Sequence, residues 1–589
     1  MLPLSFTVSG FSLFLGALAL IGWIVASCCC REYMAHETNR PRFYCFWILT
    51  FFAVLGVFFA ADFLTAFVFF EIMSFTSCVL VLHSETPAAL RASDTYLAVA
   101  VLGGMATLMG LFLLQNLTGT LTFAALPDAC AAVENRAQLY AAGALIFVGF
   151  AAKAGLFPLH IWLPTAHPAA PAPASAVLSG VITKCGVFGV LILCTRILPE
   201  VQSWGLLLLA LCAVTMVLGA VLAIFSNDLK RTFACSSVSQ IGFVLTGAAM
   251  LCLLGPEHNA LAAQGVVLHI LNHATIKIIL FPCAGIIHLS THSYDLNDIR
   301  GFGRGKPLLA LIMGIPMFSL AGVPLLSGYI SKTLLHESLV EYRAELTAHG
   351  AAALDTFVGA AEWAFLLAGG LTFAYMLKVF VCIFLQKNAN PPHSRAPYVR
   401  PISYLPLLLC ALALPVFGML PNWTMAPIAH GAMGFLTPAH AHEVAWFSLV
   451  NLKGAAISLA IGIVVYLVVV RGWLTREGRY VQRWPEKLNL ENQIYRPVLL
   501  KLLPDLGALA ARCLDAIPNL CEHGLRALIF AGGRRTICPP EDDHFARYRA
   551  SRARTLGKHH TLAYSMAWAC GGIVVLCGYL VAVYFLYES

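Results

Sequence analysis

The sequence predicts an all-α polytopic membrane protein with about 14 transmembrane helices. The 589-residue chain is 59% hydrophobic and only 11% charged, whereas soluble proteins carry about a quarter charged residues. Its mean hydropathy is +0.79. The apolar residues form continuous runs, each long enough to cross about 30 Å of hydrocarbon as a helix. A soluble globular class is therefore excluded.

The apolar runs give the expected spans in order along the chain. They lie near residues 5–30, 43–61, 63–83, 95–115, 139–163, 169–197, 204–226, 231–254, 260–290, 308–340, 355–387, 401–420, 444–470 and 561–587. The first run has no basic segment before it and is long enough to remain as a helix, so we expect no cleaved signal peptide.

Lysine and arginine are concentrated in the loops on one side of these spans. With the N-terminus outside, the basic loops fall inside; these loops contain Arg31, Arg40, Arg42, Lys230, Arg231, Arg300, Arg304, Lys306, Lys387, Arg395 and Arg400. The segment 471–560, which is strongly basic, falls inside too. By the positive-inside rule we expect a multi-pass protein of the inner (cytoplasmic) membrane, with this last segment on the cytoplasmic side.

Seven titratable side chains interrupt the apolar spans. A charged group at the bilayer centre costs several kcal/mol, so such groups usually serve a function. The seven are Glu71, Lys153, Lys184, His269, His273, Lys277 and Lys332. The alternative is that a lysine near a span end reaches the interface with its ammonium group, and this stays open for Lys332.

Three of these groups share one helix. His269, His273 and Lys277 follow each other at intervals of four, so they lie on one face. A face with three proton-exchanging groups predicts a proton relay. Hydrogen bonds that only hold neighbouring helices together are the alternative.

Prolines accompany two of the lysines in opposite order. Pro158 and Pro164 follow Lys153, whereas Pro316 and Pro324 precede Lys332. A proline removes a backbone hydrogen bond and favours a broken helix. Broken helices in corresponding positions are typical of inverted repeats. We therefore expect two inverted five-helix halves.

The motifs along the first 470 residues resemble those of a known family. They are FEIMSFTS, GFAAKAGLFPLHIWLPTAHPAAPAPASAVLSGVITKCGVFG, NDLKRTFACSSVSQIG, HILNHATIKIILFPCAGII and PLLSGYISKTLLHE. The resemblance is to the antiporter-like, proton-conducting membrane subunits of respiratory complex I, of Mrp cation/proton antiporters, and of hydrogenase-4 and formate hydrogenlyase. The segment PLHIWLPTAHPAAP is most similar to the sequences of the hydrogenase-4 and formate hydrogenlyase branch.

The resemblance implies a role for each buried group. Glu71 matches an acid that pairs with the broken-helix lysine, Lys153. Lys184 matches the central lysine or histidine, and His269, His273 and Lys277 match the central histidine/lysine helix. Lys332 matches the terminal lysine, where hydrogenase-4 members carry an acid and the distal complex I subunit a lysine, so the chain mixes two patterns. Family members commonly have about two further helices before the region matching 5–42, and we expect another subunit or lipid to cover that surface.

The chain after residue 470 predicts an amphipathic helix followed by an anchor. Apolar residues recur every three or four positions over 494–530, from Ile494 and Val498 through Leu502, Leu506 and Leu509, with charges between them. The stretch is too charged to span and resembles the lateral helix of the distal complex I subunit. A helix that binds only anionic lipid is the alternative. The expected parts of the chain are an N-terminal helix and loop (1–42), two five-helix repeats (43–203 and 204–400), two additional helices (401–475), the amphipathic lateral segment (476–560) and the anchor helix (561–589).

Two functions remain open from the sequence. The chain is either an ion-translocating subunit of a redox-driven complex, such as a membrane-bound hydrogenase or complex I relative, or a subunit of an Mrp-type antiporter driven by ion gradients alone. A channel of an inorganic-carbon pump is a weaker alternative.

The sequence shows no CxxC pair and no Gly-rich nucleotide motif, so we expect no cofactor or metal in this chain, and its enzyme status stays undecided. Expected partners are other membrane subunits, hydrophilic redox subunits indirectly, and lipid, but no nucleic acid. Lysines and histidines favour protons, because a sodium site needs oxygen ligands.

Overall fold

The structure is a computed structural model that describes residues 4–388, 401–439, 444–502, 504–509 and 511–512. Residues 5–500 form one compact unit, apart from the described residues before and after them. The predicted anchor 561–587, and the predicted lateral helix beyond residue 512, lie outside the described residues.

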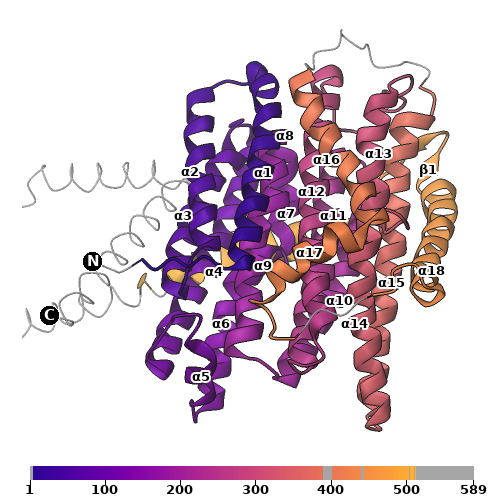
Figure 1. The fold of residues 1–589 in the computed structure, drawn as a ribbon. Coiled ribbons are helices and arrows are strands. Elements are labelled where there is room, and N and C mark those ends of the chain that lie inside the picture. Colours follow the sequence, from indigo (N-terminus) through magenta and orange to yellow (C-terminus); the bar gives the residue numbers. More distant parts are fainter. Residues whose placement is uncertain (1–3, 389–400, 440–443, 503, 510, 513–589) are drawn as a thin grey trace, which may run out of the picture. The chain divides into compact units, whose positions relative to one another are not determined.

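The compact unit is a bundle of helices that run roughly side by side (Figure 1). The first ten are α1 (Gly10–Tyr33), α2 (Arg40–Phe58), α3 (Phe63–Leu82), α4 (Pro87–Thr118), α5 (Leu126–Ala131), α6 (Arg136–Ala154), α7 (Trp162–Ala169), α8 (Ala172–Val177), α9 (Thr183–Ile192) and α10 (Gln202–Phe225). The others are α11 (Leu229–Leu253), α12 (Ala260–Thr291), α13 (Pro307–Ala321), α14 (Ser327–Ala348), α15 (Ala352–Phe380), α16 (Pro401–Met419), α17 (Pro421–Met433) and α18 (Leu449–Val465). A short hairpin joins β1 (Thr475–Arg476) to β2 (Arg479–Tyr480).

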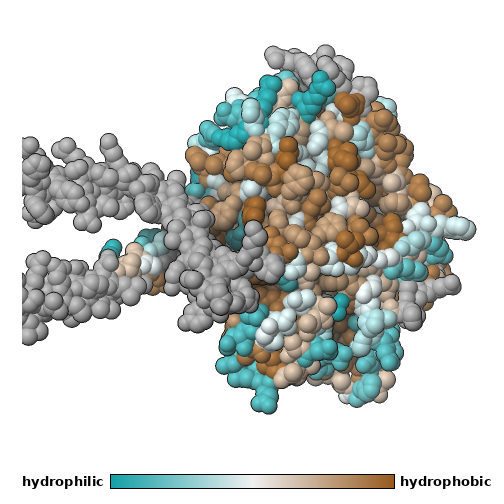
Figure 2. All heavy atoms as spheres, turned by 60° about the vertical axis from the view of Figure 1, so that its left-hand side comes forward, coloured by the Kyte–Doolittle hydropathy of each residue, from teal (hydrophilic) through white to brown (hydrophobic). Residues whose placement is uncertain are grey.

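Twelve helices of the described residues are long and apolar enough to cross a membrane. They correspond to twelve of the predicted spans. A thirteenth, 308–340, is divided into α13 and α14. Hydrophobic side chains form a broad band on one face of the unit, with hydrophilic residues gathered above and below it (Figure 2). The all-α polytopic prediction is confirmed, whereas the two inverted halves stay a prediction.

Both predicted helix breaks are present, but only two of the four prolines that were expected to cause them lie in the breaks. α6 ends at Ala154, one residue after Lys153, and the chain is irregular until a short 3-10 turn at Leu159–Ile161. α13 ends at Ala321, and α14 begins at Ser327. Pro158 and Pro324 lie in these breaks. The expectation for the other two was wrong: Pro164 is in the first turn of α7, where no backbone N–H is needed, and Pro316 lies inside α13.

Each break begins at a glycine in the left-handed region. Gly155 has φ +87° and Gly322 has φ +83°, a conformation that other residues adopt only at a cost. The two sites share the order Ala-Gly followed by an apolar residue and a nearby proline. The glycines therefore end α6 and α13 beside the two lysines.

Small residues allow the helices around the breaks to approach closely. A Cβ on Gly186 of α9 would lie 2.3 Å from the backbone nitrogen of Ala154. A Cβ on Gly219 of α10 would lie 2.5 Å from the backbone nitrogen of Ser239 in α11. Glycine at helix interfaces is typical of membrane bundles, where packing replaces the hydrophobic effect.

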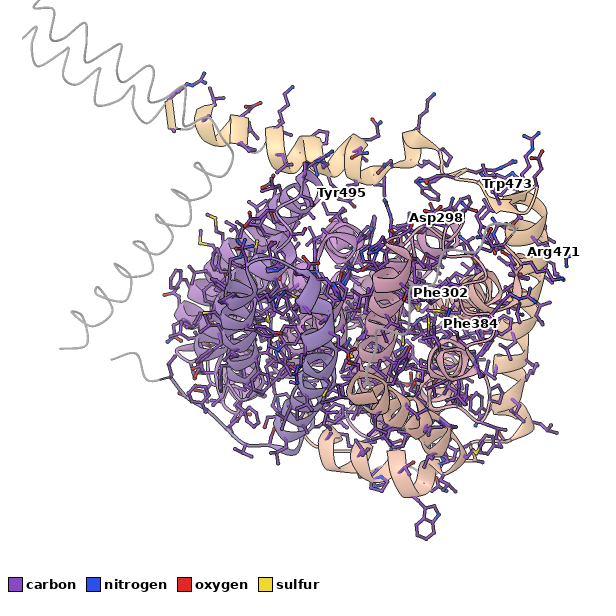
Figure 3. All side chains as sticks on the ribbon, turned by 90° about the horizontal axis from the view of Figure 1, so that it is seen from above. Asp298, Phe302, Phe384, Arg471, Trp473 and Tyr495 are labelled. Atoms are coloured by element: carbon purple, nitrogen blue, oxygen red, sulfur yellow. The ribbon has the colours of Figure 1, made fainter. Side chains whose placement is uncertain are left out.

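The described part of the predicted lateral helix is helical, and its apolar stripe is exposed. Wide helical turns occur at Glu491–Tyr495 and Val498–Leu502. Ile494 and Val498, which belong to the predicted apolar stripe, are 50% and 37% exposed. Tyr495 faces the bundle instead (Figure 3). An exposed apolar stripe fits a neighbouring membrane subunit as well as lipid, so the lateral helix stays a prediction.

Candidate proton pathway

The first group of the candidate pathway is the lysine at the end of α6. Lys153 is only 4% exposed, and its Nζ donates a 2.7 Å hydrogen bond to the hydroxyl of Tyr96 on α4. The same Nζ lies 4.5 Å from the centre of the Tyr96 ring. The Tyr96 hydroxyl also bonds Ser77 of α3, at 2.6 Å. A neutral oxygen and an aromatic face therefore hold this lysine within the membrane.

Glu71 lies near this lysine without binding it directly. Among the described residues, ion pairs within 4.0 Å include neither Glu71 nor Lys153. One carboxylate oxygen of Glu71 is buried and has no hydrogen-bond partner in the described part of the chain. It lies against Gly104 of α4, whose Cβ, if present, would be 2.5 Å from that oxygen. The direct Glu71–Lys153 ion pair implied by the resemblance is not formed in this structure.

The central lysine and histidine make a direct contact. Lys184 on α9 and His273 on α12 are 1% and 0% exposed, and Nζ lies 2.8 Å from Nδ1. Lys184 also donates to the carbonyl of Ser179, at 2.7 Å. Ser179 belongs to the π-helical segment Leu178–Ile182, and such segments are frequent at functional sites. A proton can be shared between these two nitrogens without an intervening water.

His269 connects the central helix to α14. It is one helical turn from His273, and its Nδ1 lies 2.9 Å from the hydroxyl of Ser331. Its Nε2 lies 3.1 Å from the side-chain oxygen of Gln240 on α11. Ser331 precedes Lys332 directly. The histidine face predicted from the spacing therefore points from Lys184 towards Lys332.

The remaining two lysines bind backbone carbonyls. Lys277 is fully buried and donates to the Phe233 carbonyl at 2.8 Å and to the Ser236 hydroxyl. Lys332 is 8% exposed and donates to the Leu320 carbonyl at 2.8 Å. Leu320 is in the last turn of α13, where the break leaves carbonyls without helical partners. Because Lys332 is held inside the bundle, the interface-reaching alternative does not describe its position.

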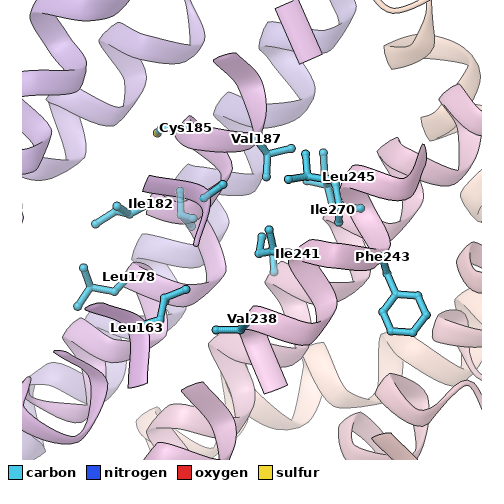
Figure 4. Close-up of a cluster of buried hydrophobic side chains, with 14 of the residues drawn as sticks. Leu163, Leu178, Ile182, Cys185, Val187, Val238, Ile241, Phe243, Leu245 and Ile270 are labelled. Atoms are coloured by element: carbon cyan, nitrogen blue, oxygen red, sulfur yellow. The ribbon is translucent and has the colours of Figure 1, made fainter. Parts of the chain in front are cut away.

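Buried apolar side chains pack between the helices that carry the central groups. Val187 of α9 and Val238 and Ile241 of α11 belong to this hydrophobic cluster (Figure 4). The described hydrogen bonds join Lys184 to His273 and His269 to Ser331 of α14. They join neither His273 to His269 nor Lys153 to Lys184, and Nε2 of His273 has no hydrogen-bond partner among the described residues. The structure thus brings together the second half of the predicted set and leaves Glu71 and Lys153 as a separate group.

Several polar partners were not predicted from the sequence. Tyr96, Ser331 and Gln240 are uncharged and occur within spans, so nothing distinguished them from residues that bond their own helix. Ser331 alone carried a signal, because it lies beside Lys332 in the quoted motif.

Comparison with known proteins identifies the family of this bundle. Residues 60–355 match the transmembrane family described as NADH:quinone oxidoreductase/Mrp antiporter. The chain belongs to this family. All seven groups of the pathway fall within the matched residues.

Members of the family from two kinds of complex are similar to this chain. Hydrogenase-4 component B of Escherichia coli (strain K12) is 30% identical over 390 residues, which cover 65% of this chain and 57% of that protein. A Na(+)/H(+) antiporter subunit of Alkalihalophilus pseudofirmus is 29% identical over 416 residues, which cover 69% of this chain and 80% of that protein. The chain therefore spans little more than half of the hydrogenase-4 component.

Chains of two solved membrane complexes share the fold. The Mrp complex from Dietzia sp. DQ12-45-1b contains a chain with a TM-score of 0.64 at 22% identity, covering 78% of this chain and 86% of that chain. The membrane-bound sulfane sulfur reductase, an archaeal respiratory membrane complex, contains one with a TM-score of 0.63 at 22% identity, covering 77% and 86%. The chain is thus an antiporter-like, multi-pass integral membrane protein.

Proposed function

We propose that this chain carries protons across the cytoplasmic membrane as an antiporter-like subunit of a multisubunit, redox-driven complex. The observation that carries the proposal is the buried series Lys184, His273, His269 and Lys332. Its first two members are 2.8 Å apart, and Ser331 bonds the third at 2.9 Å beside the fourth. His273 and His269 lie one turn apart on α12, without a hydrogen bond between them. In our proposal, groups within hydrogen-bond reach pass the proton directly, and side-chain motion or water carries it between the two histidines.

Charge changes at the first group would drive the relay. A nearby positive or negative charge alters how stable a buried ammonium is. In our proposal, Glu71 stabilises protonated Lys153 through space, and a change in their separation releases the proton towards Lys184. Water in the broken-helix region completes this first step, and the proton continues along His273 and His269 to Lys332.

The pathway is built from nitrogen groups, which supports protons as the transported ion. Sodium prefers several oxygen ligands, whereas Lys184 and His273 offer nitrogens to each other. The proposed partners are other membrane subunits, with hydrophilic redox subunits further away. The similarity to hydrogenase-4 component B supports a redox-driven complex.

An Mrp-type cation/proton antiporter is the second candidate. The similarity to the Na(+)/H(+) antiporter protein of Alkalihalophilus pseudofirmus supports it equally. Purification of the complex from its native membrane distinguishes the two. Co-purifying subunits with iron–sulfur or nickel sites support the redox-driven complex, and small antiporter subunits without redox centres support the alternative.

A single substitution tests the pathway itself. Lys184→Met keeps the length of the side chain but removes the group that contacts His273, so we expect proton transport to fall by roughly 100-fold or more. The complex reconstituted in vesicles with a pH-sensitive dye measures this. Lys378→Met is the matched control, because Lys378 is equally buried but its described hydrogen bonds go to the Ile224 and Ser226 carbonyls, at 2.8 and 2.6 Å, and to no titratable side chain. Transport at the wild-type rate in assembled Lys184→Met complexes would remove Lys184 from the pathway.

A further inference from the structure

A small cavity lies beside the last lysine of the pathway. Lys332 and His336 both line it, together with Gly322 of the break and Ser458 of α18. Its volume is about 30 Å³, and a space of this size holds one or two water molecules. Because Lys332 and His336 are four residues apart on α14, their side chains lie on the same face of the helix.

His336 continues from this cavity into a group of charged residues. Its Nε2 lies 3.0 Å from Oε1 of Glu362 on α15, and its Nδ1 lies 3.8 Å from Oε1 of Glu337. The other oxygen of Glu362 accepts a 2.7 Å bond from Nη1 of Arg343, whose Nε bonds Asp355 at 2.8 Å. The exposed fraction of the side chains rises from 17% and 15% at His336 and Glu362 to 35% at Arg343. The group therefore leads from a buried lysine to the surface.

A purely structural role explains only part of this arrangement. Arg343 of α14 pairs with both Asp355 and Glu362 of α15. These two ion pairs would hold the helices together even without the histidine. His336 adds a proton-exchanging group on the side of the cavity that contains Lys332. The Lys332 ammonium has no acidic partner within 4.0 Å among the described residues. His336, which lines the same cavity, is therefore a candidate acceptor for its proton.

We propose that His336 and Glu362 form the gate through which Lys332 exchanges its proton with the aqueous phase at the Ala348 end of α14. The proton leaves the Lys332 ammonium through the cavity water and binds a ring nitrogen of His336. Lys332 is then a neutral amine, and Glu362 stabilises the imidazolium. His336 becomes neutral again when it releases the proton to water. Arg343 positions the Glu362 carboxylate and takes no proton itself. This inference rests on the proposed function.

The Ala348 end of α14 is the outer side by the positive-inside prediction. The loop before α13 carries Arg300, Arg304 and Lys306, which places that loop inside, so α13 and α14 together lead outward. The gate would therefore connect the pathway to the side opposite the basic loops.

The test uses the assembled complex in vesicles. His336→Gln keeps a donor for Glu362 but cannot carry a proton, so we expect proton transport to fall by roughly 100-fold while assembly and thermal stability stay at wild-type values. His349→Gln is the matched control, since this exposed histidine follows the last residue of α14 and its described side-chain contact is with the Glu345 carbonyl, at 2.9 Å. This variant should transport normally. His336→Ala should lose transport and regain part of it when imidazole is added, because free imidazole can enter the enlarged cavity and carry the proton.

Each outcome decides between the explanations. Wild-type transport in His336→Gln, or lower thermal stability with no imidazole rescue in His336→Ala, shows that the histidine only joins helices and overturns the gate. If Lys184→Met abolishes transport while His336→Gln does not affect it, the gate fails and the proposed function stands. If Lys184→Met transports normally, both fail together, since the gate serves that pathway.

Discussion

At the scale of single residues, the buried lysines share a common environment. Lys153 binds a tyrosine hydroxyl, Lys277 and Lys332 bind carbonyls, and Lys184 binds a carbonyl and a histidine nitrogen. A neutral acceptor stabilises an ammonium less than a carboxylate does in a low-dielectric interior. Because no close acid among the described residues fixes the charged form, small changes in the surroundings can change the protonation of these lysines.

Glu71 is the residue whose influence on this balance can be tested. We expect Glu71→Gln to lower proton transport by less than Lys184→Met does, because the glutamate acts on Lys153 only through space. Gly104→Ala should act in the same direction, since its Cβ would displace the buried carboxylate oxygen. Dye-loaded vesicles measure both, and Glu134→Gln, at an exposed glutamate, is the control. Wild-type transport by Glu71→Gln across the whole pH range would show that the acid has no part in switching.

At the scale of elements, the two broken helices depend on glycine. A non-glycine residue in the left-handed region costs about 1–2 kcal/mol. At Gly155 an added Cβ would also lie 2.1 Å from Cδ1 of Leu163 in α7. Gly119 has a similar φ of +69°, but no atom lies within 4 Å of its added Cβ.

We therefore expect Gly155→Ala to lower the unfolding temperature in detergent more than Gly119→Ala does. The first variant has both backbone strain and a clash with Leu163, whereas the second has backbone strain alone. Thermal unfolding of the two purified variants compares the effects directly. Equal shifts would mean that the helix end at Gly155 moves freely, and that the break is not held by the packing against α7.

The elements and the site differ in how far the sequence could predict them. The spans follow from continuous apolar runs, and Lys184, His269 and His273 were found because a titratable group within lipid is costly. The partners were not found, since Tyr96 has no such signal. His336 and Glu362 were missed because they lie near the ends of the predicted spans 308–340 and 355–387, where polar residues are indistinguishable in sequence from solvated ones. The breaks were assigned to prolines, although a proline in a first turn or inside a packed helix need not break it.

At the scale of the whole molecule, the segment after β2 connects distant parts of the compact unit. The Tyr495 ring lies 6.2 Å from the ring of His160, edge to face, and Nη1 of Arg496 donates a 3.4 Å bond to the Thr95 hydroxyl on α4. His160 belongs to the short turn in the break after Lys153. The segment therefore touches the first broken helix with one face, while Ile494 and Val498 remain exposed on another.

Two truncations separate the roles of these faces. Deletion of 494–589 removes Tyr495, Arg496 and the predicted anchor, whereas deletion of 501–589 keeps the contacts with His160 and Thr95. If the distal part docks on a neighbouring membrane subunit, both truncations should loosen assembly on native gels, since each loses that part. The core bundle should stay folded in both, because its buried pathway lies between Glu71 and Lys332. Transport per assembled complex should fall further in the longer deletion, which alone frees the break beside Lys153. Full assembly with normal transport after deletion of 494–589 would show that the segment neither holds the complex together nor supports the broken helix.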